Sequence, residues 1–210
     1  ALAAAVDELG VPSVNLSYFR SGGRGVLPDN QHAGRLAARV LADAGCTALA
    51  YCPMPGQLFS LGRSRGLRDE ARRLGLPVRR DAPAEPRLRQ AWLRALPADC
   101  GVLAANDLLA LTLLGELRLL GIAVPGRLRV CGVDDDACAA ALAEPALTSI
   151  PLPIAGLAAA IVAALDQAFA GAAAPREPLL VPFPPPMLRA STGGGDGLDR
   201  AQAAMQAGLA

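Results

Sequence analysis

Residues 101–136 read G-V-L-A-A-N-D-L-L-A-L-T-L-L-G-E-L-R-L-L-G-I-A-V-P-G-R-L-R-V-C-G-V-D-D-D. The apolar run Gly101–Ala105 predicts a buried strand, and the run Arg129–Val133 predicts a second one. Between them, apolar residues at helical spacing predict a helix that begins at Asp107 and ends at Gly121. A strand, a helix and a strand in this order are typical of two parallel strands joined by a helical crossover.

The same alternation continues along the chain. It predicts further strands at 13–16, 47–52, 147–150 and 179–181, and further helices at 29–45, 61–74, 88–96, 136–142 and 154–169. The strands are apolar without interruption, so they predict a parallel sheet that is covered on both faces. The fold class is therefore α/β of the doubly wound kind.

Composition excludes several classes of protein. Of the 210 residues, 52% are hydrophobic and 19% charged, which favours a folded core over disorder. The net charge of +1 gives no reason to expect nucleic acid on this surface. The five cysteines show no C-x-x-C spacing, which favours buried thiols in a reducing, cytoplasmic compartment over a metal site. The uncharged run 150–165 is broken by prolines and a glycine, so we expect no membrane span.

The two ends of the chain differ from its middle. Residues 1–45 supply one predicted strand and two predicted helices, a brief one that ends at Gly10 and the one at 29–45. These elements cannot bury their apolar faces alone. We therefore expect either further strands upstream in a longer parent protein or packing on a partner. At the other end, residues 193–197 (G-G-G-D-G) predict a flexible linker, and residues 198–209 a short amphipathic helix.

Polar residues follow the predicted strands where a ligand site is expected. Asn106 follows one strand, Asp134 follows the next, and the loop after 47–52 leads to Arg63. An amide, a carboxylate and a guanidinium suit a neutral polyhydroxyl ligand. Asp107 and Asp136 fit helix N-caps instead, which would leave Asn106 and Asp134 free to face a cleft.

Seven segments in order resemble the effector-binding domain of LacI/GalR-type bacterial transcription regulators. They are V-P-S-V-N-L-S (11–17), L-P-D-N-Q-H-A-G-R-L-A-A-R-V-L-A-D-A-G (27–45), R-S-R-G-L (63–67), A-N-D-L-L-A (105–110), G-I-A-V-P-G-R-L-R-V-C-G-V-D-D-D (121–136), P-A-L-T-S-I (145–150) and M-L-R-A-S-T (187–192). The segment 132–150 further resembles the xylose-regulator (XylR) branch of the AraC family, which carries the same sensor domain.

The resemblance implies a periplasmic-binding-protein-like fold of type I with two α/β lobes. Residues 1–45 and 152–174 would form an incomplete first lobe, and residues 46–151 and 175–192 the second. The family's effector contacts fall on Arg63, Asn106 and Asp134. The resemblance also implies a homodimer that binds DNA through a helix-turn-helix domain outside this chain.

We therefore expect the ligand-sensing domain of a transcription regulator that responds to a sugar or a similar small polyhydroxyl effector. The alternative is the sugar-binding protein of an ABC transporter, which shares the two-lobe fold. An enzyme is not expected, because the sequence shows no G-x-S-x-G, Walker or paired acid–base motif. For the same reason we expect no cofactor.

Overall fold

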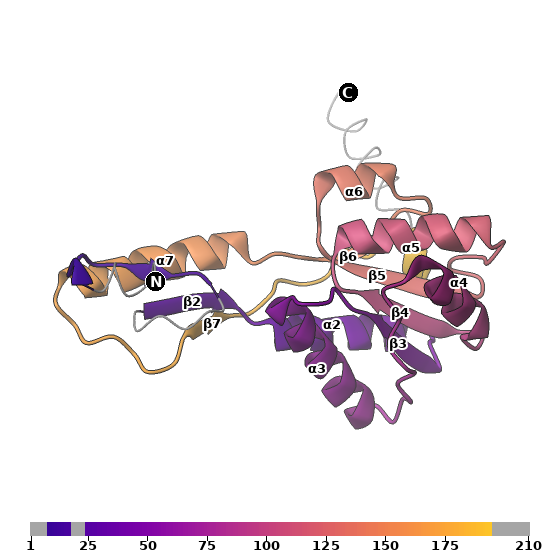
Figure 1. The fold of residues 1–210 in the computed structure, drawn as a ribbon, viewed down its shortest axis with the longest axis horizontal. Helices are drawn as coiled ribbons and strands as arrows, with labels where there is room; N and C mark the ends of the chain where they lie inside the picture. Colours follow the sequence, from indigo (N-terminus) through magenta and orange to yellow (C-terminus); the bar gives the residue numbers. More distant parts are fainter. Residues whose placement is uncertain (1–7, 18–23, 195–210) are drawn as a thin grey trace, which may run out of the picture. The chain divides into compact units, whose positions relative to one another are not determined.

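The computed structural model describes residues 8–17 and 24–194 (Figure 1). The chain divides into two compact units, each with its own parallel sheet. Unit 1 consists of Ala1–Asp29 and Pro153–Phe183, and unit 2 of Asn30–Leu152 and Pro184–Ala210. The predicted helix before Gly10 and the predicted helix at 198–209 lie largely or wholly outside the described residues.

Unit 2 is built on a four-stranded sheet in the order β3-β4-β5-β6. All its neighbouring strands pair in parallel. The strands are β3 (Ala48–Cys52), β4 (Cys100–Ala104), β5 (Leu128–Asp134) and β6 (Thr148–Pro151). Every residue of β3 and β4 is buried, as their uninterrupted apolar runs predict.

Helices cover both faces of this sheet. They are α2 (Asn30–Asp43), α3 (Leu58–Arg73), α4 (Pro86–Ala95), α5 (Asp107–Leu119) and α6 (Ala137–Leu142). On one face, α4 and α5 pack through Leu93 and Leu113 onto strand residues such as Val102. On the opposite face, α2 brings Leu41 against Gly101. Figure 1 shows α5 and α2 on opposite sides of the sheet, which confirms the doubly wound architecture of this unit.

The segment that closes the described chain also belongs to unit 2. Met187 pairs with Ser149 of β6 in an antiparallel bridge, and the short 3-10 helix η1 (Ala190–Thr192) follows. The Ser191 hydroxyl donates to the Val130 carbonyl at 2.7 Å and accepts from the Thr148 amide at 2.9 Å. Through these two hydrogen bonds Ser191 ties the closing segment to both β5 and β6.

Unit 1 has a three-stranded parallel sheet in the order β1-β2-β7 and one long helix. The elements are β1 (Val14–Asn15), β2 (Arg24–Pro28), β7 (Leu179–Val181) and α7 (Ile154–Phe169). No strand was predicted at β2, because its residues R-G-V-L-P lack the uninterrupted apolar run of the other strands. None of the residues of α7 is buried, although the helix is strongly apolar.

The division into units differs from the predicted lobes in two places. The predicted first lobe included residues 30–45, but α2 packs most extensively on α3 and lies in unit 2. The predicted second lobe included residues 175–183, but β7 pairs with β2 in unit 1. Among the described residues, no helix combines the length and apolarity that crossing a bilayer would need.

Candidate functional site

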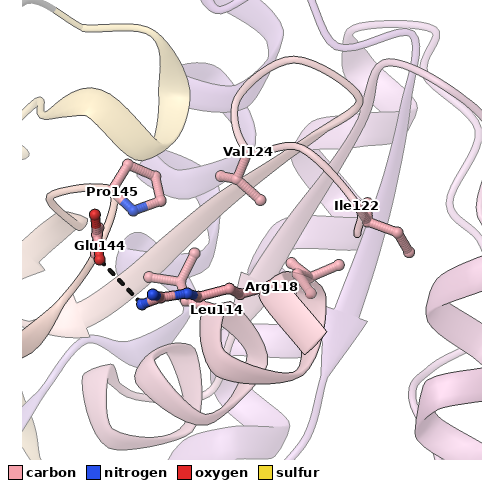
Figure 2. A pocket seen from close by; sticks show the side chains of 7 residues that line it. Leu114, Arg118, Ile122, Val124, Glu144 and Pro145 are labelled. Atoms are coloured by element: carbon pink, nitrogen blue, oxygen red, sulfur yellow. Dashed lines mark hydrogen bonds and ion pairs between the residues drawn. The ribbon is translucent and has the colours of Figure 1, made fainter. Parts of the chain in front are cut away.

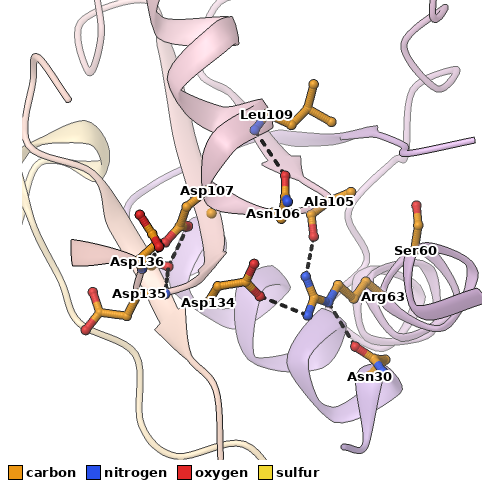
Figure 3. Close-up of polar contacts among 12 residues, drawn as sticks. Asn30, Ser60, Arg63, Ala105, Asn106, Asp107, Leu109, Asp134, Asp135 and Asp136 are labelled. Atoms are coloured by element: carbon orange, nitrogen blue, oxygen red, sulfur yellow. Dashed lines mark hydrogen bonds and ion pairs between the residues drawn. The ribbon is translucent and has the colours of Figure 1, made fainter. Parts of the chain in front are cut away.

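Arg63 lies in the second turn of α3 and reaches toward the carboxyl ends of the strands of unit 2 (Figure 3). Its guanidinium group donates to Asn30 Oδ1 at 2.9 Å, to the carbonyl of Ala105, and to Asp134 Oδ1 at 3.2 Å. It also stacks over the Phe59 ring, 4.9 Å from the centroid. Arg63 is only 3% exposed, so its orientation is set by the protein.

Close packing of α2 on α3 puts Arg63 in this position. A β-carbon on Gly66 would lie 1.9 Å from the Gln31 carbonyl oxygen, and one on Gly34 would lie 2.1 Å from the Arg63 carbonyl oxygen. Only glycine therefore allows this approach of the two backbones. The approach brings the first turn of α2, with Asn30, against Arg63.

Asn106 is the N-cap of α5, and this corrects the sequence analysis. Its Oδ1 accepts from the Leu109 amide at 3.0 Å, whereas Asp107, which was expected to be the cap, is the first helical residue. Asn106 is partly exposed, and its Nδ2 makes no hydrogen bond to another residue that the structure describes. Asp136 is an N-cap as predicted, since its carboxylate accepts from the Ala139 amide at 2.8 Å.

Asp134 ends β5, and its carboxylate points at Arg63 (Figure 3). Its backbone has φ +122° and that of Asp135 has φ +52°, values that residues with a side chain rarely adopt. Burial raises the pKa of the Asp134 carboxyl group, and the neighbouring Arg63 guanidinium opposes that rise.

The turn that follows, Asp134–Asp136, is tied to α5, β6 and the closing segment. Asp107, 1% exposed, accepts from the Asp136 amide at 2.9 Å and from the Ser149 hydroxyl at 2.7 Å. Ser149 in turn accepts from the Asp135 amide at 3.0 Å, and Arg189 Nη2 lies 2.8 Å from Asp135 Oδ1. Burial raises the pKa of the Asp107 carboxyl group, while its two hydrogen-bond donors lower it.

The three predicted site residues therefore gather at one edge of one sheet. Asp134 contacts Arg63 directly, and Arg63 also holds the carbonyl of Ala105, the residue before Asn106. The edge presents a carboxylate and an amide, with a guanidinium held beneath them. These groups accept from and donate to hydroxyl groups. Among the described residues, no cluster of histidine, cysteine and acidic side chains has the make-up of a metal site.

Sequence reasoning missed three residues that shape this edge. Asn30 binds Arg63, Ser149 binds the amide of Asp135, and Arg189 pairs with its carboxylate. All three lie inside motifs that were quoted for the family resemblance, but nothing in their spacing assigned them to the site.

A separate concavity lies near the C-terminal end of α5 (Figure 2). It has a volume of about 400 Å³ and is lined by Leu114, Leu117, Arg118, Ile122, Val124, Glu144 and Pro145. Arg118 and Glu144 pair across it at 3.1 Å with side chains 78% and 81% exposed, so the pair contributes little. None of the predicted site residues lines this pocket, and we do not assign it to the effector.

A doubly wound unit with polar side chains from successive strand ends at one edge defines an α/β domain of the small-molecule-binding type. The chain belongs to the family of periplasmic binding protein-like domains, whose pattern matches residues 38–192. This confirms the predicted fold class.

Transcription regulators are among the similar proteins. An HTH-type transcriptional regulator from Streptomyces limosus is 32% identical over an alignment of 182 residues, and the match covers 80% of this chain and 51% of that protein. The chain thus spans about half the length of this relative. This finding agrees with the predicted resemblance to LacI/GalR-type regulators and not with an enzyme.

Solved structures show the same fold. A LacI-family transcriptional regulator from Sanguibacter keddieii is 28% identical with a TM-score of 0.70, covering 87% of this chain and 72% of that one. The transcriptional regulator CelR in complex with cellobiose is 26% identical with a TM-score of 0.71, covering 89% and 60%. The xylose-binding transcription activator XylR, 23% identical with a TM-score of 0.78 and covering 92% and 56%, is similar in fold.

Proposed function

We propose that this chain is the ligand-sensing domain of a bacterial transcription regulator, and that its effector is a sugar or a similar small polyhydroxyl molecule. The observation that carries the proposal is the contact of Arg63 with both the Asp134 carboxylate and the carbonyl of Ala105, the residue before Asn106. The CelR relative is solved with cellobiose, which supports a sugar as the class of effector.

In this proposal each of the three side chains has a role. The Asp134 carboxylate accepts from two vicinal hydroxyls of the sugar, and the Asn106 amide nitrogen donates to a hydroxyl oxygen. Arg63 donates to the effector and keeps the Asp134 carboxylate charged and oriented. Burial raises the pKa of the Asp134 carboxyl group, and this guanidinium favours its ionised form.

The proposal extends to the longer protein. It places the regulator in the cytoplasm as a homodimer that binds DNA through a helix-turn-helix domain outside this chain, as the Streptomyces relative's helix-turn-helix description supports. That domain precedes the sensor in the LacI type and follows it in the XylR branch of the AraC family. The regulator relatives favour this function over a transporter's sugar-binding protein.

Titration calorimetry with cellobiose, D-xylose and D-xylulose tests the proposal. We expect one of these sugars to bind, and the Asp134→Asn variant to bind it roughly 10 to 100-fold more weakly, the effect of losing a charged hydrogen-bond acceptor. Asp69→Asn, which removes an exposed carboxylate on α3, is the control and should leave the affinity unchanged. Equal affinity of wild type and Asp134→Asn for the sugar would refute the site. Failure of all three sugars to bind the wild type would refute the effector class.

A further inference from the structure

Two consecutive residues with side chains adopt left-handed backbone conformations in the turn after β5. Asp134 has φ +122° and Asp135 has φ +52°, and neither is a glycine. Such conformations persist only where the surrounding structure holds them. The turn carries the carboxylate that pairs with Arg63, so whatever holds its backbone also sets where that carboxylate lies.

Two buried side chains hold this turn through its backbone. The Ser149 hydroxyl accepts from the Asp135 amide at 3.0 Å, and the Asp107 carboxylate accepts from the Asp136 amide at 2.9 Å. Ser149 also donates to Asp107 at 2.7 Å, so the two side chains form one unit. Both are 1% exposed, and water does not compete for these hydrogen bonds.

The neighbouring strand leaves room for this unit. A β-carbon on Gly132 would lie 2.0 Å from Asp107 Oδ1, so only glycine at this position of β5 admits the carboxylate. The unit therefore joins three elements: Asp107 begins α5, Ser149 lies in β6, and the two amides belong to the turn that leaves β5.

We propose that Ser149 and Asp107 are positioning residues for the effector site. They fix the Asp135 and Asp136 amides, and thereby keep the Asp134 carboxylate beside Arg63 in the position in which it receives the effector. That Asp134 contacts an effector rests on the proposed function. That Ser149 and Asp107 hold the turn does not depend on any ligand.

A matched pair of substitutions separates positioning from plain structural support. Ser149→Ala removes a buried hydroxyl that accepts one amide hydrogen bond and donates one hydrogen bond. Ser191→Ala removes another buried hydroxyl with the same two kinds of bond, from the Thr148 amide and to the Val130 carbonyl. Neither of its partners belongs to the turn, so a loss of stability alone would affect both variants alike.

Amide hydrogen exchange in the ¹⁵N-labelled chain, without ligand, is the first measurement. We expect the Asp135 and Asp136 amides to exchange at least tenfold faster in Ser149→Ala than in wild type, and to change less than twofold in Ser191→Ala. Asp107→Asn, which keeps the size of the side chain, should also speed exchange of the Asp136 amide. Exchange at both amides within twofold of wild type in Ser149→Ala and Asp107→Asn would overturn the proposal.

The second measurement is the dissociation constant of whichever of cellobiose, D-xylose and D-xylulose binds the wild type. Ser149→Ala should weaken binding about tenfold, whereas Ser191→Ala should weaken it less than twofold at a similar midpoint of urea unfolding. Equal losses of affinity would assign Ser149 a structural role only and would overturn the inference. If the wild type binds none of the three sugars, the proposed function fails, and the exchange rates still decide whether the unit holds the turn.

Discussion

Gly66→Ala should destabilise the chain because α2 and α3 are in backbone contact at this residue. The added β-carbon would lie 1.9 Å from the Gln31 carbonyl oxygen and 2.7 Å from its carbon. The helices must separate by about 1.5 Å before this contact becomes an ordinary one. Overpacking of this kind costs about 1–3 kcal/mol of stability. Because the added β-carbon meets the backbone of Gln31, which cannot rotate away as a side chain could, we expect a cost at the upper end of that range.

Gly115→Ala is the matched control for this substitution. Gly115 lies within α5, and a β-carbon there would meet no atom within 4 Å. Alanine is better than glycine in a helix interior by about 1 kcal/mol, so this variant should be more stable than wild type by up to that amount. The two variants share the gain in helix propensity, and their difference isolates the contact between α2 and α3.

Urea unfolding followed by circular dichroism measures both free energies. We expect Gly66→Ala to be less stable than Gly115→Ala by about 3 kcal/mol, the cost of the clash, because both variants gain the same helix propensity. Because Arg63 lies one turn before Gly66, the variant should also lose effector affinity. Equal stabilities for the two variants would refute the close approach of the helices and, with it, the stated reason for the position of Arg63.

Three further outcomes follow from buried polar groups and thiols. Arg89 donates to the buried Glu116 carboxylate at 2.9 Å, so Arg89→Met leaves that carboxylate unpaired. The substitution should lower the free energy of unfolding in urea by about 3–5 kcal/mol, and adding Glu116→Leu should recover most of this loss. The arginines around Glu70 lower its pKa to about 2 from an ordinary 4.5, so its contribution to stability is present above pH 4.5 and is lost toward pH 2. Glu70→Gln should therefore be about 1–2 kcal/mol less stable than wild type at pH 7, a gap that closes on acidification. Ellman's reagent should quickly label the exposed Cys138 in the native chain, and Cys138→Ser should abolish that reaction. The other four cysteines should react slowly because burial raises the pKa of their thiols; they are Cys46, Cys52, Cys100 and Cys131.

The strands of unit 2 could be predicted from sequence because each is buried on both faces. Buried parallel strands need apolar residues at every position, and such runs have clear ends. In contrast, β2 (R-G-V-L-P) has an arginine, a glycine and a proline among its five residues and follows a glycine-rich segment. Its strand conformation depends on pairing with β1 and β7, which no local pattern records.

The shared edge of the site could be predicted, but its internal contacts could not. Parallel strands bring their carboxyl ends together, so Asn106 and Asp134 had to lie near one another. The pairing of Arg63 with Asp134 joins residues 71 positions apart and depends on the close approach of two helices at Gly34 and Gly66. The capping role of Asn106 was missed because Asn106 and Asp107 are both good N-cap residues, and tertiary hydrogen bonds of Asp107 decide between them.

The charges at this edge favour a neutral effector over an ionic one. Arg63 is almost fully buried and Asp134 is partly buried, and each compensates the charge of the other at 3.2 Å. A ligand that carried its own charge would draw one partner away and leave the other uncompensated in a poorly solvated position, which is costly. The hydroxyl groups of a sugar instead add hydrogen bonds to the carboxylate and amide while the ion pair stays intact. On the proposed function, the same pairing that orients Asp134 would thus also favour an uncharged ligand.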